Sequence, residues 1–369
     1  MAPTVSSWSP LRWAALGATV MLAAVPAWAT GPDDTATAVG APVPQAWSAS
    51  AAVGLGPLTQ GSQSPTSVFR LSHPAGTPST LGEGQWEIQS LTDWANYFCD
   101  GHDRYFLDYE SLRARLSVAY GAAPRTQVTL SSSASYQGGG ILDGFIEGFE
   151  RSVGAINHDR RQAPRNRYLI RARDTDGSVR EYGGRESGWH VENATFEVKH
   201  LVLEGTETAP SVVATAIVKL PIGSYVPGRP NGGVDVGARL DAGVRRGRFN
   251  LYGSLGVVAF GNRDSLGVDL LPYQLSIMTA VEVRTTPRTS LVTQALISGP
   301  VARHAGEFSD NTREIAIGLK HRMGPDLLLE LSVVENLLVF GNSADIAFHA
   351  GLTWRPGSGR AAIQCHSVR

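Results

Sequence analysis

The stretch Val234-Asp235-Val236-Gly237-Ala238-Arg239-Leu240-Asp241-Ala242-Gly243-Val244 alternates strictly between aliphatic residues and charged residues or glycine. A period of two places one kind of residue on each face of a β-strand. The stretch is about twice as long as the five or six residues of an average strand in a water-soluble protein. Strands of about ten residues with one apolar and one polar face are typical of barrels that span the bacterial outer membrane.

The same period recurs along the chain from Gln85 onward and predicts twelve strands. They are 85–93, 111–120, 125–136, 192–203, 211–221, 234–244, 248–260, 273–285, 290–298, 313–322, 327–335 and 345–355. The connections between them alternate between short and long, and membrane barrels have an even strand count, short periplasmic turns and longer extracellular loops. The sequence therefore predicts an all-β fold, a transmembrane antiparallel up-and-down β-barrel of about twelve strands with both termini in the periplasm.

Composition excludes several other classes of protein. The 32 Lys and Arg residues balance the 33 Asp and Glu residues, so nucleic acid is not expected as a partner. Two cysteines in 369 residues exclude a disulfide scaffold and a cysteine-rich zinc module, and we expect neither a cofactor nor a metal. A mean hydropathy of −0.09 is too polar for a bundle of membrane helices, but it suits a barrel that buries every second side chain in lipid.

The chain divides into four expected parts. Residues 1–29 carry the apolar stretch Trp13–Val25 and the small-residue site Ala27-Trp28-Ala29, the pattern of a cleaved signal peptide. Residues 30–83 form a low-complexity segment rich in Pro, Gly, Ser and Thr, 84–356 form the barrel, and 357–369 form a periplasmic tail. These features predict export to the outer membrane, with its lipid, lipopolysaccharide and the barrel-assembly machinery as partners.

The connection 137–191 holds the candidate site residues. Residues 141–153 have an apolar stripe at helical spacing, so this extracellular loop is expected to carry a short helix. The helix either folds into the barrel mouth as a constriction or caps the rim by packing on neighbouring loops. The arginines that follow could bind lipopolysaccharide phosphates or anionic solutes, or could pair with neighbouring aspartates. The candidate ligand-binding or constriction residues are Ile141, Asp143, Phe145, Glu147, Phe149, Arg160, Arg161, Arg165 and Arg167.

The most recognisable sequence of the chain is Gly138-Gly139-Gly140-Ile141-Leu142-Asp143-Gly144-Phe145-Ile146-Glu147-Gly148-Phe149-Glu150. Gly84-Gln85-Trp86 precedes it, and Asn157–Arg161 and Pro164–Tyr168 follow. Together these segments resemble an uncharacterised proteobacterial family, domain of unknown function 3187, over residues 55–355. The resemblance implies an outer-membrane-type β-barrel and supplies no catalytic residues.

The interior of the predicted barrel suggests a function. Charges of both signs face inward, which does not indicate a sharp ion-selectivity filter. Interior Gly237, Gly243, Gly256, Gly318 and Gly351 leave room for a narrow lumen. The leading hypothesis is a channel or transport-like barrel for small solutes, and the alternative is a structural or lipopolysaccharide-contacting barrel without a conducting lumen.

A surface hydrolase is the least favoured hypothesis. His102 and His158 have aspartate neighbours on predicted extracellular loops, where such an enzyme would keep its general base. However, the sequence contains neither G-x-S-x-G nor H-E-x-x-H, and we assign no catalytic residue.

Overall fold

The computed structural model describes residues 53–68, 70–100, 105–153, 160, 163–173, 176–206, 209–223, 232–261, 264–265, 268–303, 305, 309–336 and 342–357. The expected signal peptide (1–29) and the expected tail beyond residue 357 lie outside the described residues, as do residues 30–52 of the low-complexity segment. No helix among the described residues is both long and apolar enough to span a membrane.

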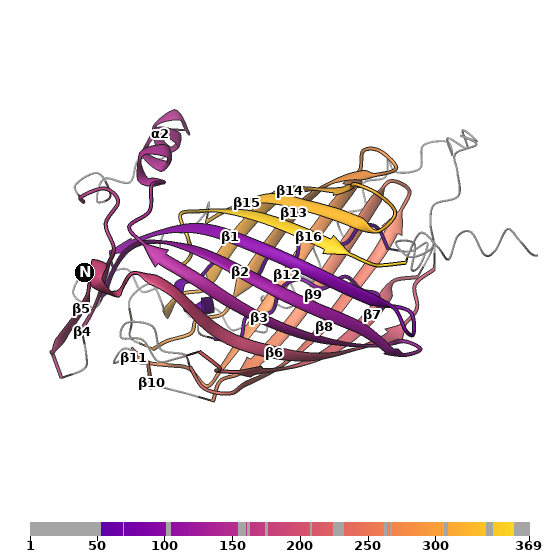
Figure 1. Ribbon diagram of the computed structural model, residues 1–369, viewed down its shortest axis with the longest axis horizontal. Coiled ribbons are helices and arrows are strands. Elements are labelled where there is room, and N and C mark those ends of the chain that lie inside the picture. Colours follow the sequence, from indigo (N-terminus) through magenta and orange to yellow (C-terminus); the bar gives the residue numbers. More distant parts are fainter. Residues whose placement is uncertain are drawn as a thin grey trace, which may run out of the picture. The chain divides into compact units, whose positions relative to one another are not determined.

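Twelve long antiparallel strands close into a barrel (Figure 1). They are β1 (Trp86–Asp100), β2 (Tyr105–Ala123), β3 (Thr126–Gly138), β6 (Gly188–Leu203), β7 (Ser211–Leu220), β8 (Asp235–Arg246), β9 (Phe249–Ala259), β12 (Tyr273–Arg284), β13 (Thr289–Ser298), β14 (Thr312–Arg322), β15 (Leu327–Glu335) and β16 (Ile346–Trp354). Each strand pairs with its neighbours in this order, and β16 returns to pair with β1, from Ile88↔Trp354 to Asn96↔Ile346. The predicted twelve-stranded all-β barrel is confirmed.

Side chains are sorted by strand face in the opposite sense to a water-soluble barrel. Arg239 is buried inside the barrel, whereas its neighbour Leu240 is 51% exposed on the outside. Large apolar side chains cover the outer face, among them Leu116, Leu130, Leu240, Leu255, Ile317 and Leu352. A continuous apolar exterior is stable only when lipid rather than water surrounds it, so the outer face is the surface of a membrane barrel.

The sheet extends beyond the predicted strands on one side of the barrel. The sequence predicts a loop over 94–110, but β1 continues to Asp100 and β2 begins at Tyr105. The extension is supported by cross-strand aromatic pairs, since the Tyr97 and Tyr109 rings stack at 4.7 Å between centroids. Beyond the barrel, β2 also pairs with β4 (Leu169–Arg173), which pairs with β5 (Val179–Tyr182).

Apart from the short connection 101–104 between β1 and β2, the connections follow the expected alternation, so the barrel has a short-turn end and a long-loop end. The connection between β3 and β6 carries the predicted short helix, α2 (Asp143–Val153), and a 3-10 helix η4 (Gly184–Glu186). The connection between β9 and β12 carries a small hairpin of two short strands, β10 (Asp264–Ser265) and β11 (Val268–Asp269).

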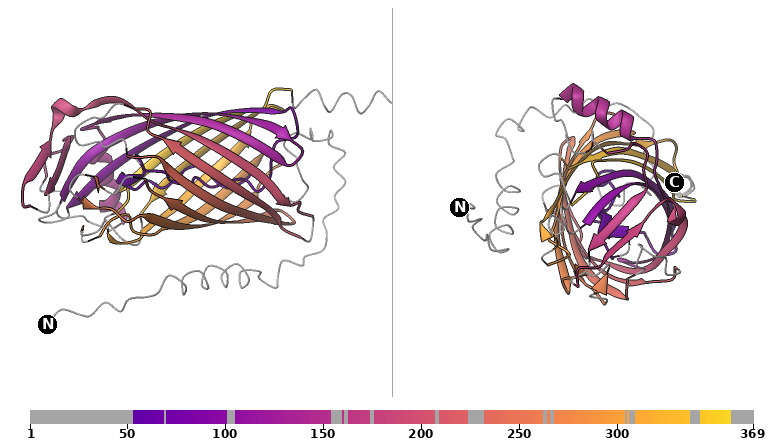
Figure 2. Two further views of the ribbon diagram at one scale, coloured as in Figure 1. Left: turned by 90° about the horizontal axis from the view of Figure 1, so that it is seen from below. Right: turned by 90° about the vertical axis from the view of Figure 1, so that its left-hand side faces the viewer.

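The described residues before β1 lie inside the barrel (Figure 2). We call residues 53–68 and 70–82 the plug segment. Its only regular element is the 3-10 helix η3 (Pro65–Val68). The segment contacts Glu282 near the short-turn end, Asn342 at the long-loop end, and Gln127 back at the short-turn end. It therefore rises through the lumen, turns, and descends to enter β1.

Candidate functional site in the barrel lumen

Buried carboxylates of the wall hold the plug segment by its backbone. A strand could not satisfy these N–H groups, because the wall strands already pair with one another, and charged acceptors make strong hydrogen bonds in a buried site. The pairs are Leu55 N–H with Glu282 (3.0 Å), Thr59 N–H with Glu330 (2.6 Å), Gln63 N–H with Glu314 (2.7 Å) and Leu71 N–H with Asp235 (2.9 Å).

Basic wall residues bind the plug carbonyls in the same way. Lys320 donates to the Leu55 carbonyl at 3.3 Å, and Arg239 donates to the Pro74 carbonyl at 2.8 Å. Both cations also have carboxylate partners on the wall, because a buried charge without one would be costly. Lys320 pairs with Glu330 (2.9 Å) and Arg239 with Asp241 (2.8 Å). A third buried wall cation, Lys219, pairs with Asp235 (2.9 Å).

Four of the five interior glycines face the plug segment rather than open space. A Cβ at Gly237 would lie 2.7 Å from the His73 ring, and one at Gly256 would lie 2.6 Å from it. A Cβ at Gly243 would meet Pro78 at 2.6 Å, and one at Gly318 would meet Leu58 at 3.0 Å. Glycine in a strand often marks a position where another part of the chain approaches closely. The room that these glycines leave is therefore largely taken by the plug segment.

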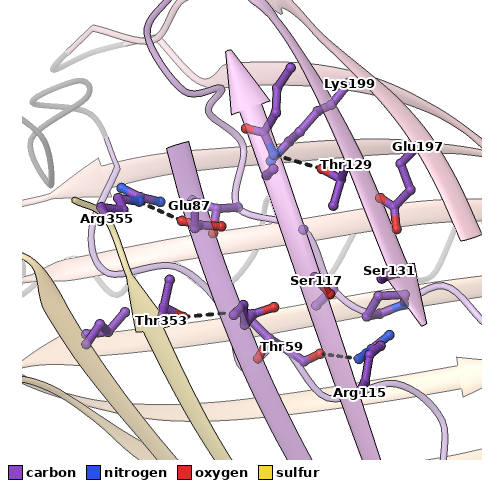
Figure 3. Close-up of a pocket in the computed structure, with 18 of the residues that line it drawn as sticks. Thr59, Glu87, Arg115, Ser117, Thr129, Ser131, Glu197, Lys199, Thr353 and Arg355 are labelled. Carbon is purple, nitrogen blue, oxygen red and sulfur yellow. Dashed lines mark hydrogen bonds and ion pairs between the residues drawn. The ribbon is translucent and has the colours of Figure 1, made fainter. Parts of the chain in front are cut away.

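The plug segment covers one side of the lumen and leaves two polar cavities on the other. The first lies between the plug and β1, β2, β3 and β6, and holds about 870 Å³ including solvent at its opening (Figure 3). The second holds about 500 Å³, again including open solvent, and lies further toward the long-loop end along the same strands. Arg115 and Ser131 line both cavities. The two cavities thus adjoin along one wall.

Two basic residues of the plug segment have lowered pKa values. Burial lowers the pKa of His73 to about 4, and nearby Arg239 lowers it further, although a hydrogen bond from its Nε2 to the Val257 carbonyl (3.1 Å) acts in the opposite sense. Burial also lowers the pKa of Arg70 to about 10, and its guanidinium lies 3.9 Å from the centre of the Phe260 ring. His73 is consequently neutral at pH 7, whereas Arg70 stays charged.

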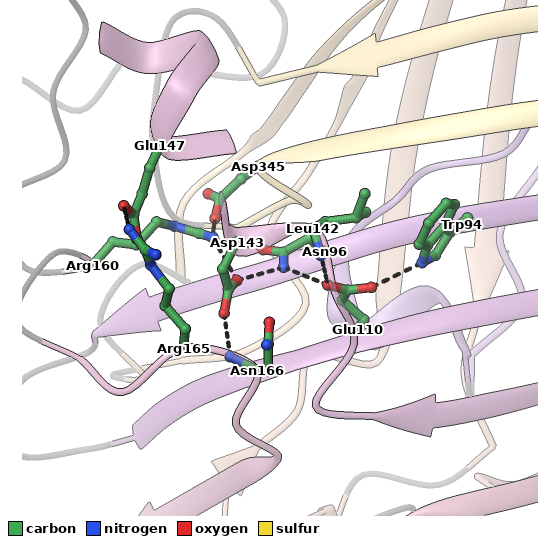
Figure 4. Close-up of polar contacts among 10 residues, drawn as sticks. All are labelled: Trp94, Asn96, Glu110, Leu142, Asp143, Glu147, Arg160, Arg165, Asn166 and Asp345. Atoms are coloured by element: carbon green, nitrogen blue, oxygen red, sulfur yellow. Dashed lines mark hydrogen bonds and ion pairs between the residues drawn. The ribbon is translucent and has the colours of Figure 1, made fainter. Parts of the chain in front are cut away.

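Three predicted site residues, Asp143, Glu147 and Arg160, are buried at the long-loop rim (Figure 4). Arg160 donates to Asp143 at 3.0 Å, to Asn96 at 2.6 Å, and to Asp345. Glu110 extends the cluster, accepting hydrogen bonds from the Trp94 indole (2.9 Å) and from the Leu142 backbone. We call Asn96, Glu110, Asp143, Arg160 and Asp345 the rim cluster.

The helix α2 packs against the outside of the barrel. Leu142 and Ile146 contact Ile346 and Phe348, which alternate with the inward-facing His349 of β16, and α2 stands outside the ring of strands in Figure 2. A Cβ at Gly144 or Gly148 would meet nothing within 4 Å. Of the two expected roles, this position favours a cap over a constriction, because the apolar stripe covers outward-facing residues at the rim.

The remaining predicted site residues are not brought together. Ile141 and Phe145 are 72% and 52% exposed. Arg165 is largely exposed and binds Glu147 at 2.9 Å, a contact that raises the pKa of Arg165. Arg167 is half-buried. Arg161, the Phe149 side chain, His102 and His158 lie outside the described residues.

Within the described part of the chain, no group of His, Cys, Asp or Glu is arranged to hold a metal ion. The residues that sequence reasoning missed are the plug contacts at Leu55, Thr59, Gln63 and Leu71. Only the interior glycines gave a signal that could have found them.

Three solved structures align with this chain. The COG4313 outer membrane channel from Pseudomonas putida F1 superposes with a TM-score of 0.52 at 10% identity, covering 76% of this chain and 98% of that one. The NanC porin gives 0.41 at 8% identity, covering 73% and 98%. The translocator domain of the autotransporter NalP from Neisseria meningitidis gives 0.34 at 10% identity, covering 74% and 89%. Of the three, the match to the Pseudomonas channel has a TM-score above 0.5, and at 10% identity it shows a shared fold alone.

No curated protein matches the sequence. A protein family does match it, over residues 36–355, which include the plug segment and the whole barrel. The chain therefore belongs to the family described as "Protein of unknown function (DUF3187)".

Proposed function

We propose that this protein is an outer-membrane channel for small polar solutes, with its short-turn end in the periplasm. The observation that carries the proposal is the pair of adjoining polar cavities between the plug segment and the wall of β1, β2, β3 and β6. Water and small solutes need a continuous polar path to cross, and side chains alone fill barrels of about eight strands, whereas twelve enclose more space. The solved Pseudomonas structure supports the proposal, because it is described as an outer membrane channel and has a similar fold.

The first test is the conductance of the purified full-length protein in planar lipid bilayers. We expect small, discrete single-channel currents, because the plug segment leaves only a narrow path. Ser117→Phe should reduce the current several-fold, since Ser117 lines the first cavity and lies opposite Ser131 in the β2–β3 pairing.

The matched control for this test is Ser90→Phe. Ser90 is exposed on the outer face of β1, in register with Leu116, so a phenylalanine there should enter lipid and leave the current unchanged. Equal currents from both variants would place the conduction path elsewhere. A folded protein that shows no current at all would overturn the channel proposal.

The alternative function is a barrel without a conducting lumen. Buried ion pairs that tie neighbouring strands together on the inner wall favour it, notably those of His349, which bridges Asp93 (2.6 Å) and Glu330 (3.1 Å). Such a barrel would be held shut by its own wall and by the plug segment. The same bilayer recording separates the two functions, because only a channel conducts.

A further inference from the structure

Basic and acidic side chains of the inner wall have different neighbours: the cavities are lined mainly by basic residues, whereas several carboxylates contact the plug backbone instead. Eight Lys and Arg residues and three Asp and Glu residues line the two cavities. The basic residues are Arg70, Arg113, Arg115, Lys199, Lys219, Arg239, Lys320 and Arg355, and the acidic ones are Glu87, Asp93 and Glu197. The carboxylates that bind plug N–H groups line neither cavity.

The plug segment causes this division. Glu282 and Glu314 bind its backbone N–H groups, are buried, and have no Lys or Arg partner within ion-pair distance among the described residues. The plug backbone therefore covers these two carboxylates, which would otherwise face the lumen. On the wall of β1, β2, β3 and β6, which the plug leaves open, the charges that line the cavities are Arg113, Arg115 and Lys199 beside Glu87, Asp93 and Glu197. Arg113, Glu87 and Asp93 are engaged in ion pairs, with Glu192, Arg355 and His349 respectively.

Two of these cations are available to a solute. In the described part of the chain, Arg115 and Lys199 form no ion pair, and both are only half-buried where they line the first cavity. Arg115 makes one long contact, 3.5 Å, to the Thr59 carbonyl. Glu197 lies on the same inward face of β6 as Lys199 and also has no ion-pair partner among these residues. The hydroxyls of Ser117 and Thr129 complete the lining as neutral donors (Figure 3).

We propose that the path selects small anions, which pass Arg115 and Lys199 in turn. This inference rests on the proposed channel function and assigns its solute class. Cation-lined pores attract anions because the field of fixed charges is focused by the low-dielectric wall. Glu197 opposes the attraction and limits the selectivity to a moderate preference.

The test is the reversal potential of the full-length channel under a gradient of potassium chloride. We expect chloride to permeate about two- to fivefold better than potassium. Arg115→Gln and Lys199→Gln should each reduce this ratio, and Glu197→Gln should raise it. Arg246→Gln is the matched control, because Arg246 ends β8 at the short-turn end and lines neither cavity.

The outcomes separate the two proposals. Measurable current with a ratio at or below one, or a ratio that none of the three cavity variants changes, would overturn the anion inference and leave the channel intact. Absence of current in a folded protein would overturn the channel function and the anion path together. Heat-modifiable gel mobility of each variant establishes that the barrel is folded.

Discussion

The position of His73 depends on the wall around it, because its ring occupies space that Gly237 and Gly256 leave free. The three atoms nearest to a Cβ at Gly237 would all belong to the plug, two in the His73 ring, the nearer at 2.7 Å, and one in Leu71 at 3.1 Å. Gly237→Ala should therefore weaken plug docking by overpacking, at a cost of about 1–3 kcal/mol, and raise single-channel conductance.

The control for this prediction is Gly351→Ala, since a Cβ there would meet the wall residues Leu91, Glu330 and His349 rather than the plug. His73→Ala in the Gly237→Ala background removes the ring and should restore wild-type conductance. A double variant that conducts like Gly237→Ala alone would show that His73 does not hold the plug.

The pKa of His73 makes plug docking depend on pH. The docked imidazole has a pKa of about 4, below the ordinary 6.5. Between pH 6.5 and about pH 4, His73 is protonated when the segment is released but neutral when it is docked. Protonation therefore favours the released state, and the equilibrium constant for docking falls with pH by at most tenfold per pH unit. The nearby charges are Arg239, which opposes protonation, and Asp241, which favours it.

Conductance recorded from pH 7.5 to 4 should accordingly rise as the pH falls through this window and stay constant above it. The rise should be smaller in His73→Gln, which cannot take up the proton. An identical pH profile in the variant would assign the dependence to another group.

At the scale of the elements, alternation in the sequence predicted most strands to within a few residues, because lipid imposes the same apolar outer face along each strand. The prediction from alternation missed the ends of β1 and β2 at the long-loop end for a physical reason. Asn96, Asp108 and Glu110 occupy outward positions there but are buried under loop residues rather than lipid. Because outward positions are expected to be apolar, polar residues at these positions make the strand seem to end too early in the sequence.

The face assignment itself is open to test on β8 and β7. Leu240→Arg places a charge on the outer face near the middle of β8 and should cost about 2–4 kcal/mol in lipid. Leu220→Arg makes the same change at the end of β7, where the cost near the interface falls to about 0–1 kcal/mol. Equal folded yields on heat-modifiable gels would show that these residues do not face lipid.

The rim cluster holds α2 in place without reaching the lumen. Arg160→Gln removes the cation that Asp143 and Asp345 share, and breaking a buried pair in this way typically costs about 3–5 kcal/mol. We expect the β3–β6 connection to become sensitive to protease while conductance stays unchanged. Arg165→Gln, at a largely exposed pair, should leave the protease sensitivity of this connection close to that of the wild type. A changed conductance in Arg160→Gln would show that α2 influences the conduction path after all.

At the scale of the whole molecule, the barrel could be predicted from the sequence but its contents could not. Wall residues follow a period because two environments alternate along each strand. The plug segment has no such period, because it is held mainly by its backbone N–H and carbonyl groups, which every sequence possesses. Its Pro, Gly and Ser content indicates only the absence of regular structure, and its partners are wall charges that sequence reasoning assigned to ion pairs or to an open lumen.

Plug and wall together determine both the size and the charge of the path, so removing the plug should change both. A variant lacking residues 53–80 opens the lumen, and conductance should rise several-fold. It also uncovers Glu282 and Glu314, which lose the backbone donors that now bind them. Inward-facing carboxylates favour cations, so the preference should shift from chloride toward potassium in the same recording. Glu282→Gln and Glu314→Gln in the shortened chain should reverse that shift, whereas in the intact chain they should change selectivity little, since the plug already covers both groups. Higher conductance with unchanged anion preference would mean that the open wall alone sets selectivity and that the plug acts only by filling space.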